Sequence, residues 1–364
     1  MIDGKKIGID ARMIEMSGIG TYIQHLMGQG IYDYAFGDEE EIRRYDSEVS
    51  IIPFSAVIYG PKEQLRFPSK EFRSCGIDLM HFPHYNVPAS FRGSYVVTVH
   101  DLTHIIFPQF MGNKFKSTYA KMLMSRALRN ARHVFTVSNN SKDDIVRIFG
   151  TDQERITITY NAIDSDFVVK DPTELDYLYD RFSIPRDKKT VLYVGNLKPH
   201  KNLQTLLQAF VRMNRSDVVL ILAGKAFKAI DLEQKEEELG IASQVIHTGL
   251  VSKNELVDLY NIADLFAFPS LYEGFGIPPL EAMACGTPVV AANNSSIPEV
   301  VGDAALLVDG LDIAGMASAI DELIDDEDKC RGLVKRGMAR VSMFSWDDTV
   351  RRVKQILSQT LLED

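Results

Sequence analysis

The sequence predicts an α/β protein made of two doubly wound domains, each with a parallel sheet covered by helices. Its 364 residues exceed what one simple core needs and fit two domains of ordinary size. Short apolar runs alternate with helical patterns along the chain, as in successive βαβ units. Several of these runs stop at turns rich in glycine or proline, as buried parallel strands do at their carboxyl ends.

Composition narrows the class of protein further. Hydrophobic residues make up 45% of the chain and charged residues 25%, which is typical of a soluble globular enzyme. No apolar run approaches the roughly 20 residues that a membrane-spanning helix needs. The 3 cysteines are far apart and lack CxxC spacing, which argues against a disulfide framework or a zinc site. We therefore expect a cytoplasmic protein without a bound metal.

The charge is unevenly distributed. The net charge of −10 argues against a nucleic-acid partner. Residues 1–170 carry 20 basic and 20 acidic side chains, whereas residues 171–364 carry 20 and 30. An anionic ligand in the acidic second half would need locally placed cations, so the lysines there are informative.

The first domain is expected to span residues 1–170. Lys6–Asp10 reads as its first strand, and Gly18-Ile19-Gly20 reads as a turn before a helix that starts near Tyr22. The Gly-x-Gly turn is only half of a dinucleotide fingerprint, so a nicotinamide site is poorly supported. The polar stretch Phe167–Lys189 is the expected boundary, and residues 186–344 the second domain.

A buried strand, Tyr95–Val99, delivers His100 and Asp101 to its carboxyl end. A single histidine is more often structural than catalytic. Ligands of open α/β sheets, however, bind outside the carboxyl ends of the strands, which favours a functional role for His100. Asp101 is a candidate for orienting its ring.

Residues 113–133 form a basic segment with six Lys or Arg and no acidic residue. Apolar residues recur there at helical spacing, which predicts an amphipathic helix. It is either a surface helix whose apolar face joins the core or a contact with an anionic membrane face.

The second domain opens with the strand Thr190–Gly195, followed by a loop that contains Lys198 and Lys201 and by a helix that begins near Leu203. Ammonium groups and helix amides at such a strand–glycine–helix junction suit a diphosphate. The competing interpretation is that these lysines are only solvated surface residues.

The stretch from Pro269 to Gly286 follows the apolar strand Leu265–Phe268 and carries two acids, Glu273 and Glu281, on either side of Gly274-Phe275-Gly276. Pro278 and Pro279 predict a helix start, with Glu281 in its first turn. A carboxylate can accept hydrogen bonds from paired sugar hydroxyls. Alternatively, Glu281 only stabilises the helix terminus and Glu273 lies on a solvated loop.

The stretch EGFGIPPLEAMACGTPVVAAN resembles the Glu-x7-Glu motif of retaining GT-B glycosyltransferases of the group-1, glycogen-synthase-like family. VHDLTHIIFP and GNLKPHKN are similar to stretches of the mannosyltransferases of surface-polysaccharide assembly. The resemblance covers nearly the whole chain. It implies the GT-B architecture, with two Rossmann-like domains facing across a cleft and residues 345–364 crossing back onto the first domain.

The resemblance also implies roles for individual residues. His100, Glu273 and Lys201 would be catalytic, with Lys201 on the diphosphate, Glu273 on the hexose and Glu281 on the ribose. The expected donor-binding set is Gly20, Gly195, Asn196, Lys198, Lys201, Leu250, Glu273, Gly274, Phe275, Gly276, Ile277 and Glu281. Many relatives have an arginine where this chain has Asn196 or His200, and Lys198 is a candidate substitute.

The implied reaction is the metal-independent transfer of a hexose, with retention, from GDP-mannose or a UDP-hexose to a glycan or lipid-linked acceptor. No cofactor is expected, and the enzyme would be cytoplasmic, with a candidate peripheral position at the inner membrane face. Two alternatives keep the fold: a nucleotide-sugar epimerase or phosphorylase, and a non-catalytic nucleotide-sugar-binding scaffold.

Overall fold

The computed structural model describes residues 4–58, 60–111, 114–224 and 232–362, and these form two compact units. The first unit contains Met1–Asn161 and Ser345–Asp364, and the second contains Ala162–Phe344. The second unit thus begins before the boundary expected at 167–189. The reason is local: the Lys170 amide donates to Asn261 Oδ1 at 2.7 Å, and Asp164 pairs with Lys253 at 2.7 Å, so this segment is bound to the second unit.

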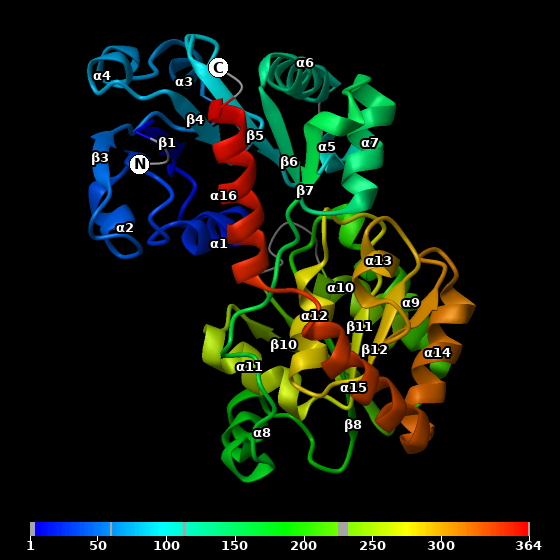
Figure 1. Ribbon diagram of the computed structural model, residues 1–364. Coiled ribbons are helices and arrows are strands. Elements are labelled where there is room, and N and C mark those ends of the chain that lie inside the picture. The colour runs from blue at the N-terminus through cyan, green and yellow to red at the C-terminus, as the bar shows by residue number, and fades with distance from the viewer. Residues whose placement is uncertain (1–3, 59, 112–113, 225–231, 363–364) are drawn as a thin grey trace. The chain divides into compact units, whose positions relative to one another are not determined.

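The first unit is built on a seven-stranded parallel sheet in the order β3-β2-β1-β4-β5-β6-β7 (Figure 1). Its strands are β1 (Ile7–Asp10), β2 (Tyr34–Gly37), β3 (Ser50–Pro53), β4 (Leu79–Phe82), β5 (Ser94–Val99), β6 (His133–Thr136) and β7 (Ile156–Ile158). Its helices are α1 (Ser17–Leu26), α2 (Glu39–Arg43), α3 (Pro61–Leu65), α4 (Ser69–Ser74), α5 (Thr103–Ile106), α6 (Lys114–Asn130), α7 (Asn139–Phe149) and α16 (Trp346–Leu362).

The terminal helix α16 completes the core of the first unit beside α1 (Figure 1). Val353, Leu357 and Leu361 of α16 lie in the same apolar cluster as the first strand and α1. Trp346 stacks on His25 of α1, with ring centroids 4.1 Å apart. The single tryptophan of the chain therefore reports on the first unit.

The expected Gly18-Ile19-Gly20 turn is instead the first turn of α1. A Cβ atom on Gly20 would lie 2.4 Å from the carbonyl oxygen of Ile14. Close packing of the helix against the preceding loop therefore explains this glycine.

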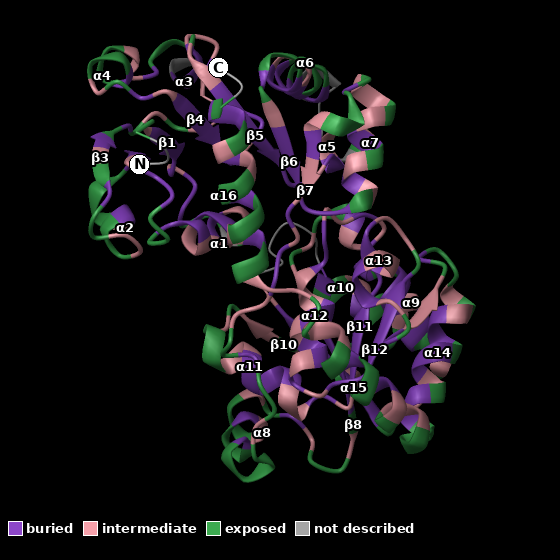
Figure 2. Ribbon diagram, in the orientation of Figure 1, coloured by how far each residue is buried: buried purple, intermediate pink, exposed green. Residues whose placement is uncertain are grey.

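The second unit has a six-stranded parallel sheet in the order β10-β9-β8-β11-β12-β13. Figure 2 shows that β11 and β12 are buried, whereas the surrounding helices keep exposed faces. Its strands are β8 (Lys189–Val194), β9 (Val218–Ala223), β10 (Val245–Gly249), β11 (Leu265–Phe268), β12 (Val289–Ala292) and β13 (Leu306–Val308). Its helices are α8 (Asp176–Phe182), α9 (Leu203–Met213), α10 (Leu232–Leu239), α11 (Lys253–Ile262), α12 (Ile277–Ala284), α13 (Ile297–Val301), α14 (Ile313–Asp325) and α15 (Glu327–Val341).

Each sheet has one point where the strand order reverses. In the second unit this switch lies between β8 and β11, and in the first between β1 and β4. Open α/β sheets bind ligands in the crevice outside the carboxyl ends of the strands at such points. The topology therefore directs attention to the loops after β8 and β11.

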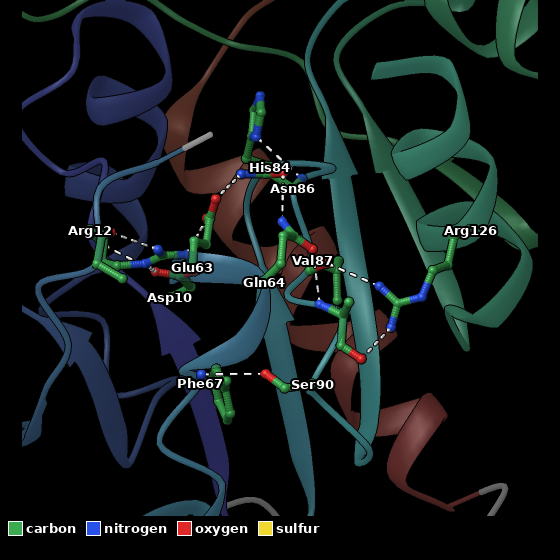
Figure 3. A network of polar contacts seen from close by, with 12 residues as sticks. Asp10, Arg12, Glu63, Gln64, Phe67, His84, Asn86, Val87, Ser90 and Arg126 are labelled. Atoms are coloured by element: carbon green, nitrogen blue, oxygen red, sulfur yellow. Dashed lines mark hydrogen bonds and ion pairs between the residues drawn. The ribbon is translucent and has the colours of Figure 1, made fainter. Parts of the chain in front are cut away.

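A buried polar network follows the switch point of the first unit (Figure 3). Arg12 pairs with Asp10 at 2.6 Å and with Glu63 at 2.9 Å, and the Glu63 side chain is 0% exposed. Asn86 donates to Glu63, and Gln64 Nε2 donates to Asn86 Oδ1 at 3.3 Å. These bonds attach α3 to the strand ends below it.

We predict that Glu63→Ala destabilises the first unit by about 1–3 kcal/mol, because it removes the acceptor of the buried Asn86 amide and one of the two carboxylates that pair with Arg12. The measurement is urea unfolding followed by the fluorescence of Trp346. The control Glu40→Ala removes an ion pair whose acidic side chain is 86% exposed and should change stability by less than about 0.5 kcal/mol. Equal midpoints for both variants would contradict the prediction.

Candidate functional site

An ion pair joins the two loops that follow the switch-point strands of the second unit. Lys201 Nζ lies 2.6 Å from Glu273 Oε1, and the two side chains are 18% and 13% exposed. The ammonium group also lies 5.7 Å from the centroid of the Phe268 ring at the end of β11. The sequence placed these residues 72 positions apart at separate strand ends, and the structure brings them into contact.

Polar contacts between neighbouring loops hold this pair in place. Asn202 Nδ2 donates to the carbonyl oxygens of Pro269 at 3.1 Å and Gly310 at 2.6 Å. The Glu273 amide donates to Ser295 Oγ at 2.9 Å, and Ser296 Oγ donates to the Glu273 carbonyl at 3.0 Å. The loops after β8, β11, β12 and β13 are therefore fastened to one another.

The glycine bend before α12 has a backbone conformation that suits glycine. Gly276 is the N-cap of α12 with φ of 99°, a conformation that favours glycine. Pro278 and Pro279 stand near the helix start, as predicted. Because they have no N–H, two of the four amides that a helix start leaves unpaired are missing, so Gly276 and Ile277 are the nearest donors for a ligand.

Glu281 lies in the second turn of α12, so its expected place in the first turn was wrong. Its partner is Tyr260 of α11, whose hydroxyl donates to Glu281 Oε2 at 2.9 Å. Burial raises the pKa of Glu281 to about 7, while the Tyr260 hydrogen bond lowers it. The residue as a whole is half-buried.

The remaining donor-binding candidates of the second unit differ in their exposure. Asn196 and Lys198 are exposed, and Asn196 Oδ1 accepts from the Lys198 amide at 3.3 Å. Leu250 is 71% exposed in the loop after β10. A Cβ atom on Gly195 would lie 2.9 Å from Tyr193 Oη. Phe275 is buried, its ring edge-on to Phe344 at 5.3 Å.

His100 belongs to the first unit, where it follows β5. Its Nε2 donates to the Pro83 carbonyl at 3.0 Å, so Nδ1 is left as the acceptor of the neutral ring. Burial lowers the pKa of His100 to about 4, which keeps it uncharged at neutral pH. The Tyr22 ring lies edge-on at 5.0 Å. Pro83, rather than Asp101, holds the ring, since Asp101 Oδ1 accepts from the Thr103 amide at 2.8 Å.

The basic segment forms α6, although Asn113 lies outside the described residues. Leu123, Met124 and Leu128 are buried, so one face joins the core. On the other face Tyr119 is 42% exposed and Met122 is 59% exposed, both close in sequence to the exposed Lys121. Arg126 instead donates to the Val87 carbonyl at 3.2 Å (Figure 3).

The described residues contain no group of three or more His, Cys, Asp or Glu side chains placed to hold a metal ion. Within the same ranges, no helix has the length and apolar character that crossing a membrane requires.

Sequence reasoning missed several residues that shape the site. Asn202 has a positive φ of 55° and crosslinks three loops, but asparagine at a helix start reads as an ordinary cap. Tyr260 sits in a helix pattern where it looks like core. Gly224 has φ of 151°, and a Cβ there would lie 1.8 Å from the Gly195 carbonyl. Only long-range packing reveals these contacts.

Comparison with known proteins identifies the chain. Residues 179–340 match the family described as glycosyl transferases group 1, and residues 33–167 match glycosyltransferase family 4. An O-antigen chain mannosyltransferase B of Escherichia coli is 33% identical over 274 residues, which cover 74% of this chain and 71% of that protein. The chain belongs to the group-1 GT-B glycosyltransferases.

One further sequence relative and two solved structures are also similar to this glycosyltransferase. The O-antigen chain mannosyltransferase RfbU of Salmonella typhimurium is 30% identical, over 77% of this chain and 72% of that protein. Sucrose-phosphate synthase of Thermosynechococcus elongatus shares the fold with a TM-score of 0.80 at 20% identity, covering 99% and 100% of the two chains. HepE of Anabaena, solved with UDP and glucose, has a TM-score of 0.79 at 22% identity, covering 97% and 99%.

We predict that Glu281→Gln stabilises this glycosyltransferase at pH 8 but not at pH 4. The folded-state pKa of Glu281 is raised from 4.5 to about 7, so the unfolded chain loses this proton first. Stability is therefore lost as the pH rises from about 4.5 to 7, at a cost of at most about 3 kcal/mol, which glutamine removes.

Calorimetric melting of both proteins at the two pH values measures this effect. The exposed Glu174 provides the matched control, because Glu174→Gln should leave the melting temperature unchanged at either pH. A lower melting temperature for Glu281→Gln at pH 8 would show that the carboxylate stabilises the fold.

Proposed function

We propose that this glycosyltransferase moves a hexose from a nucleoside diphosphate sugar to an acceptor hydroxyl, with retention and without a metal ion. The observation that carries the proposal is the Lys201–Glu273 pair at 2.6 Å, on loops at the switch point where α/β sheets bind ligands. Retention follows from the resemblance of the Glu273 to Glu281 motif to that of retaining enzymes.

The reaction requires stabilisation of the negative charge that develops on the departing diphosphate. In the structure the Lys201 ammonium faces a carboxylate, so a diphosphate would compete with Glu273 for the same cation. The start of α9, two residues after Lys201, adds the positive end of a helix dipole. A lysine and oriented amides can stabilise a developing anion as a metal would. Exposed Lys198 is a second cation in the same loop.

The other residues then have distinct roles. Glu281 accepts from the ribose hydroxyls, and Glu273, once Lys201 turns to phosphate, accepts from the hexose. Gly274 and Gly276 let the backbone approach the sugar. In the first unit, Nδ1 of the neutral His100 is an acceptor for a sugar hydroxyl.

Mannose is the hexose we favour, with GDP-mannose as donor and a UDP-hexose as the alternative. Two relatives at 30% identity or above are named O-antigen chain mannosyltransferases, which supports mannose and a glycan or lipid-linked acceptor. The structure solved with UDP and glucose supports the alternative, although at 22% identity the likeness is one of fold.

We predict that Lys201→Ala lowers the rate of hexose transfer by about 10²–10³-fold, the usual effect of removing one preorganised group that stabilises a developing anion. The assay follows release of nucleoside diphosphate from GDP-mannose or UDP-glucose with a mannosylated lipid-linked acceptor. Lys188→Ala, at the opposite end of β8, is the matched control and should keep wild-type activity.

Three results would contradict the proposal. Loss of wild-type transfer upon addition of EDTA alone would refute the metal-free mechanism. Inversion at the anomeric carbon, read from the product by NMR, would refute retention. Conversion of the donor without an acceptor would instead favour an epimerase.

We further propose that the exposed face of α6 contacts an anionic membrane surface, which would bring the enzyme to a lipid-linked acceptor. Lys121 and Arg129 are exposed there together with Tyr119 and Met122, and the sequence of the helix contains no acidic residue. Basic residues near an anionic surface contribute about 1 kcal/mol each.

The double variant Lys121→Glu/Arg129→Glu should bind vesicles of phosphatidylglycerol and phosphatidylcholine at least about tenfold more weakly than the wild type, because it reverses two charges. Co-sedimentation measures this binding. The control Lys70→Glu/Arg73→Glu makes the same charge change on the exposed face of α4. Equal weakening by both variants, or equal binding to pure phosphatidylcholine, would exclude α6 as the contact.

A further inference from the structure

Ring packing and a backbone hydrogen bond hold Tyr260 in the second unit. It lies on α11 and is 0% exposed. Its ring packs edge-on against Phe266 of β11, with centroids 5.3 Å apart, and against Phe167 at 6.1 Å. Its carbonyl oxygen accepts from Thr287 Oγ1 at 2.5 Å, next to the end of α12. The hydroxyl group therefore has a fixed position.

That hydroxyl meets the carboxylate of Glu281. Tyr260 Oη donates to Glu281 Oε2 at 2.9 Å, across the gap between α11 and α12. Above the pKa of Glu281 the carboxylate is ionised and only accepts hydrogen bonds, so the tyrosine hydroxyl is the donor. One oxygen is thereby engaged, and the orientation of the other, Oε1, is determined by the fixed tyrosine.

The charged groups around Glu281 come from three elements. Lys253 of α11 pairs with Asp164 at 2.7 Å and Asp166 at 2.6 Å, so its charge is shared with two other carboxylates. Asp164 raises the pKa of Glu281 and Lys253 lowers it, and the Glu281 charge helps raise the pKa of Cys285, which caps the end of α12. Tyr260 is thus the direct hydrogen-bond donor within this set of charges.

We propose that Tyr260 is the positioning residue for Glu281: it turns the carboxylate so that Oε1 accepts from a ribose hydroxyl of the donor nucleotide. This inference rests on the proposed function, because it assumes that the nucleotide binds at this site. Tyr260 then determines how strongly the enzyme prefers a ribonucleotide over its deoxy form, without itself contacting the reacting atoms.

The preference for a ribonucleotide over its deoxy form should also depend on pH. A protonated Glu281 binds a diol less well than the carboxylate, so the preference declines as the pH falls through the pKa of about 7. The Tyr260 hydrogen bond lowers that pKa. Its removal raises the pKa, and the preference should therefore be lost at a higher pH than in the wild type.

The experiment is isothermal titration calorimetry of the full chain with GDP, 2′-deoxyGDP and 3′-deoxyGDP, and with UDP and 2′-deoxyUDP, between pH 5.5 and 8.5. The ratio of the affinities for the ribo and deoxy forms cancels the titration of the phosphate. We expect a ratio of about tenfold to a hundredfold in the wild type at pH 8 for one of the nucleotides. Tyr260→Phe should lower this ratio by about threefold, so that a pH dependence remains measurable, and should move its midpoint to higher pH.

Two further variants separate positioning from folding. Tyr177→Phe removes another tyrosine–carboxylate bond of the second unit, to Asp258 at 2.6 Å, and should leave the ratio unchanged. Glu281→Gln should give a low ratio that does not vary with pH. Adding Tyr260→Phe to Glu281→Gln should then have no further effect, because the tyrosine acts only through the carboxylate.

The outcomes are distinguishable. If Tyr260→Phe keeps both the wild-type ratio and its pH midpoint, the positioning role is overturned while the proposed function stands. If Tyr260→Phe and Glu281→Gln have additive effects, the tyrosine acts on its own and the proposal is also overturned. If the wild type binds none of these nucleotides, the proposed function fails and this inference fails with it.

Discussion

The ion pair between Lys201 and Glu273 is the constraint on which the second unit's ligand-binding edge depends. It holds a cation and an anion at 2.6 Å, where neither strand end alone would place them. Asn202, Ser295 and Ser296 supply the hydrogen bonds that keep the two loops together. A nucleoside diphosphate sugar carries both an anion that can pair with Lys201 and hydroxyls that can donate to Glu273. Each member of the ion pair could therefore exchange its present partner for a group of the donor.

Much of the fold could be predicted from the sequence, because buried parallel strands are short apolar runs that end at breakers. Thr190–Gly195 and Leu265–Phe268 are of this kind, and the structure has β8 and β11 there. The first glycine pair was misassigned, since Gly18 and Gly20 begin a helix instead of a turn. A glycine does not reveal whether it is needed for its own conformation or, as at Gly20, for close approach of another backbone segment.

The candidate site was predicted in part. Glu273, Glu281 and Lys201 stand out in the sequence because two acids flank a glycine bend and a lysine follows a strand–glycine turn, and a family motif surrounds the two acids. What orients them could not be found this way. Tyr260 looks like a core residue in sequence, and its hydroxyl acquires meaning only when α11 packs beside α12. Glu281 also lies one turn later than expected, which points it at that hydroxyl rather than at the helix start.

The most direct test of this account is a crystal structure of the enzyme with GDP-mannose or UDP-glucose bound. The account predicts that the diphosphate lies against Lys201, which has then released Glu273, and that a ribose hydroxyl lies within hydrogen-bond distance of Glu281 Oε1. A nucleotide bound elsewhere, with the Lys201–Glu273 pair intact and Glu281 facing water, would contradict it.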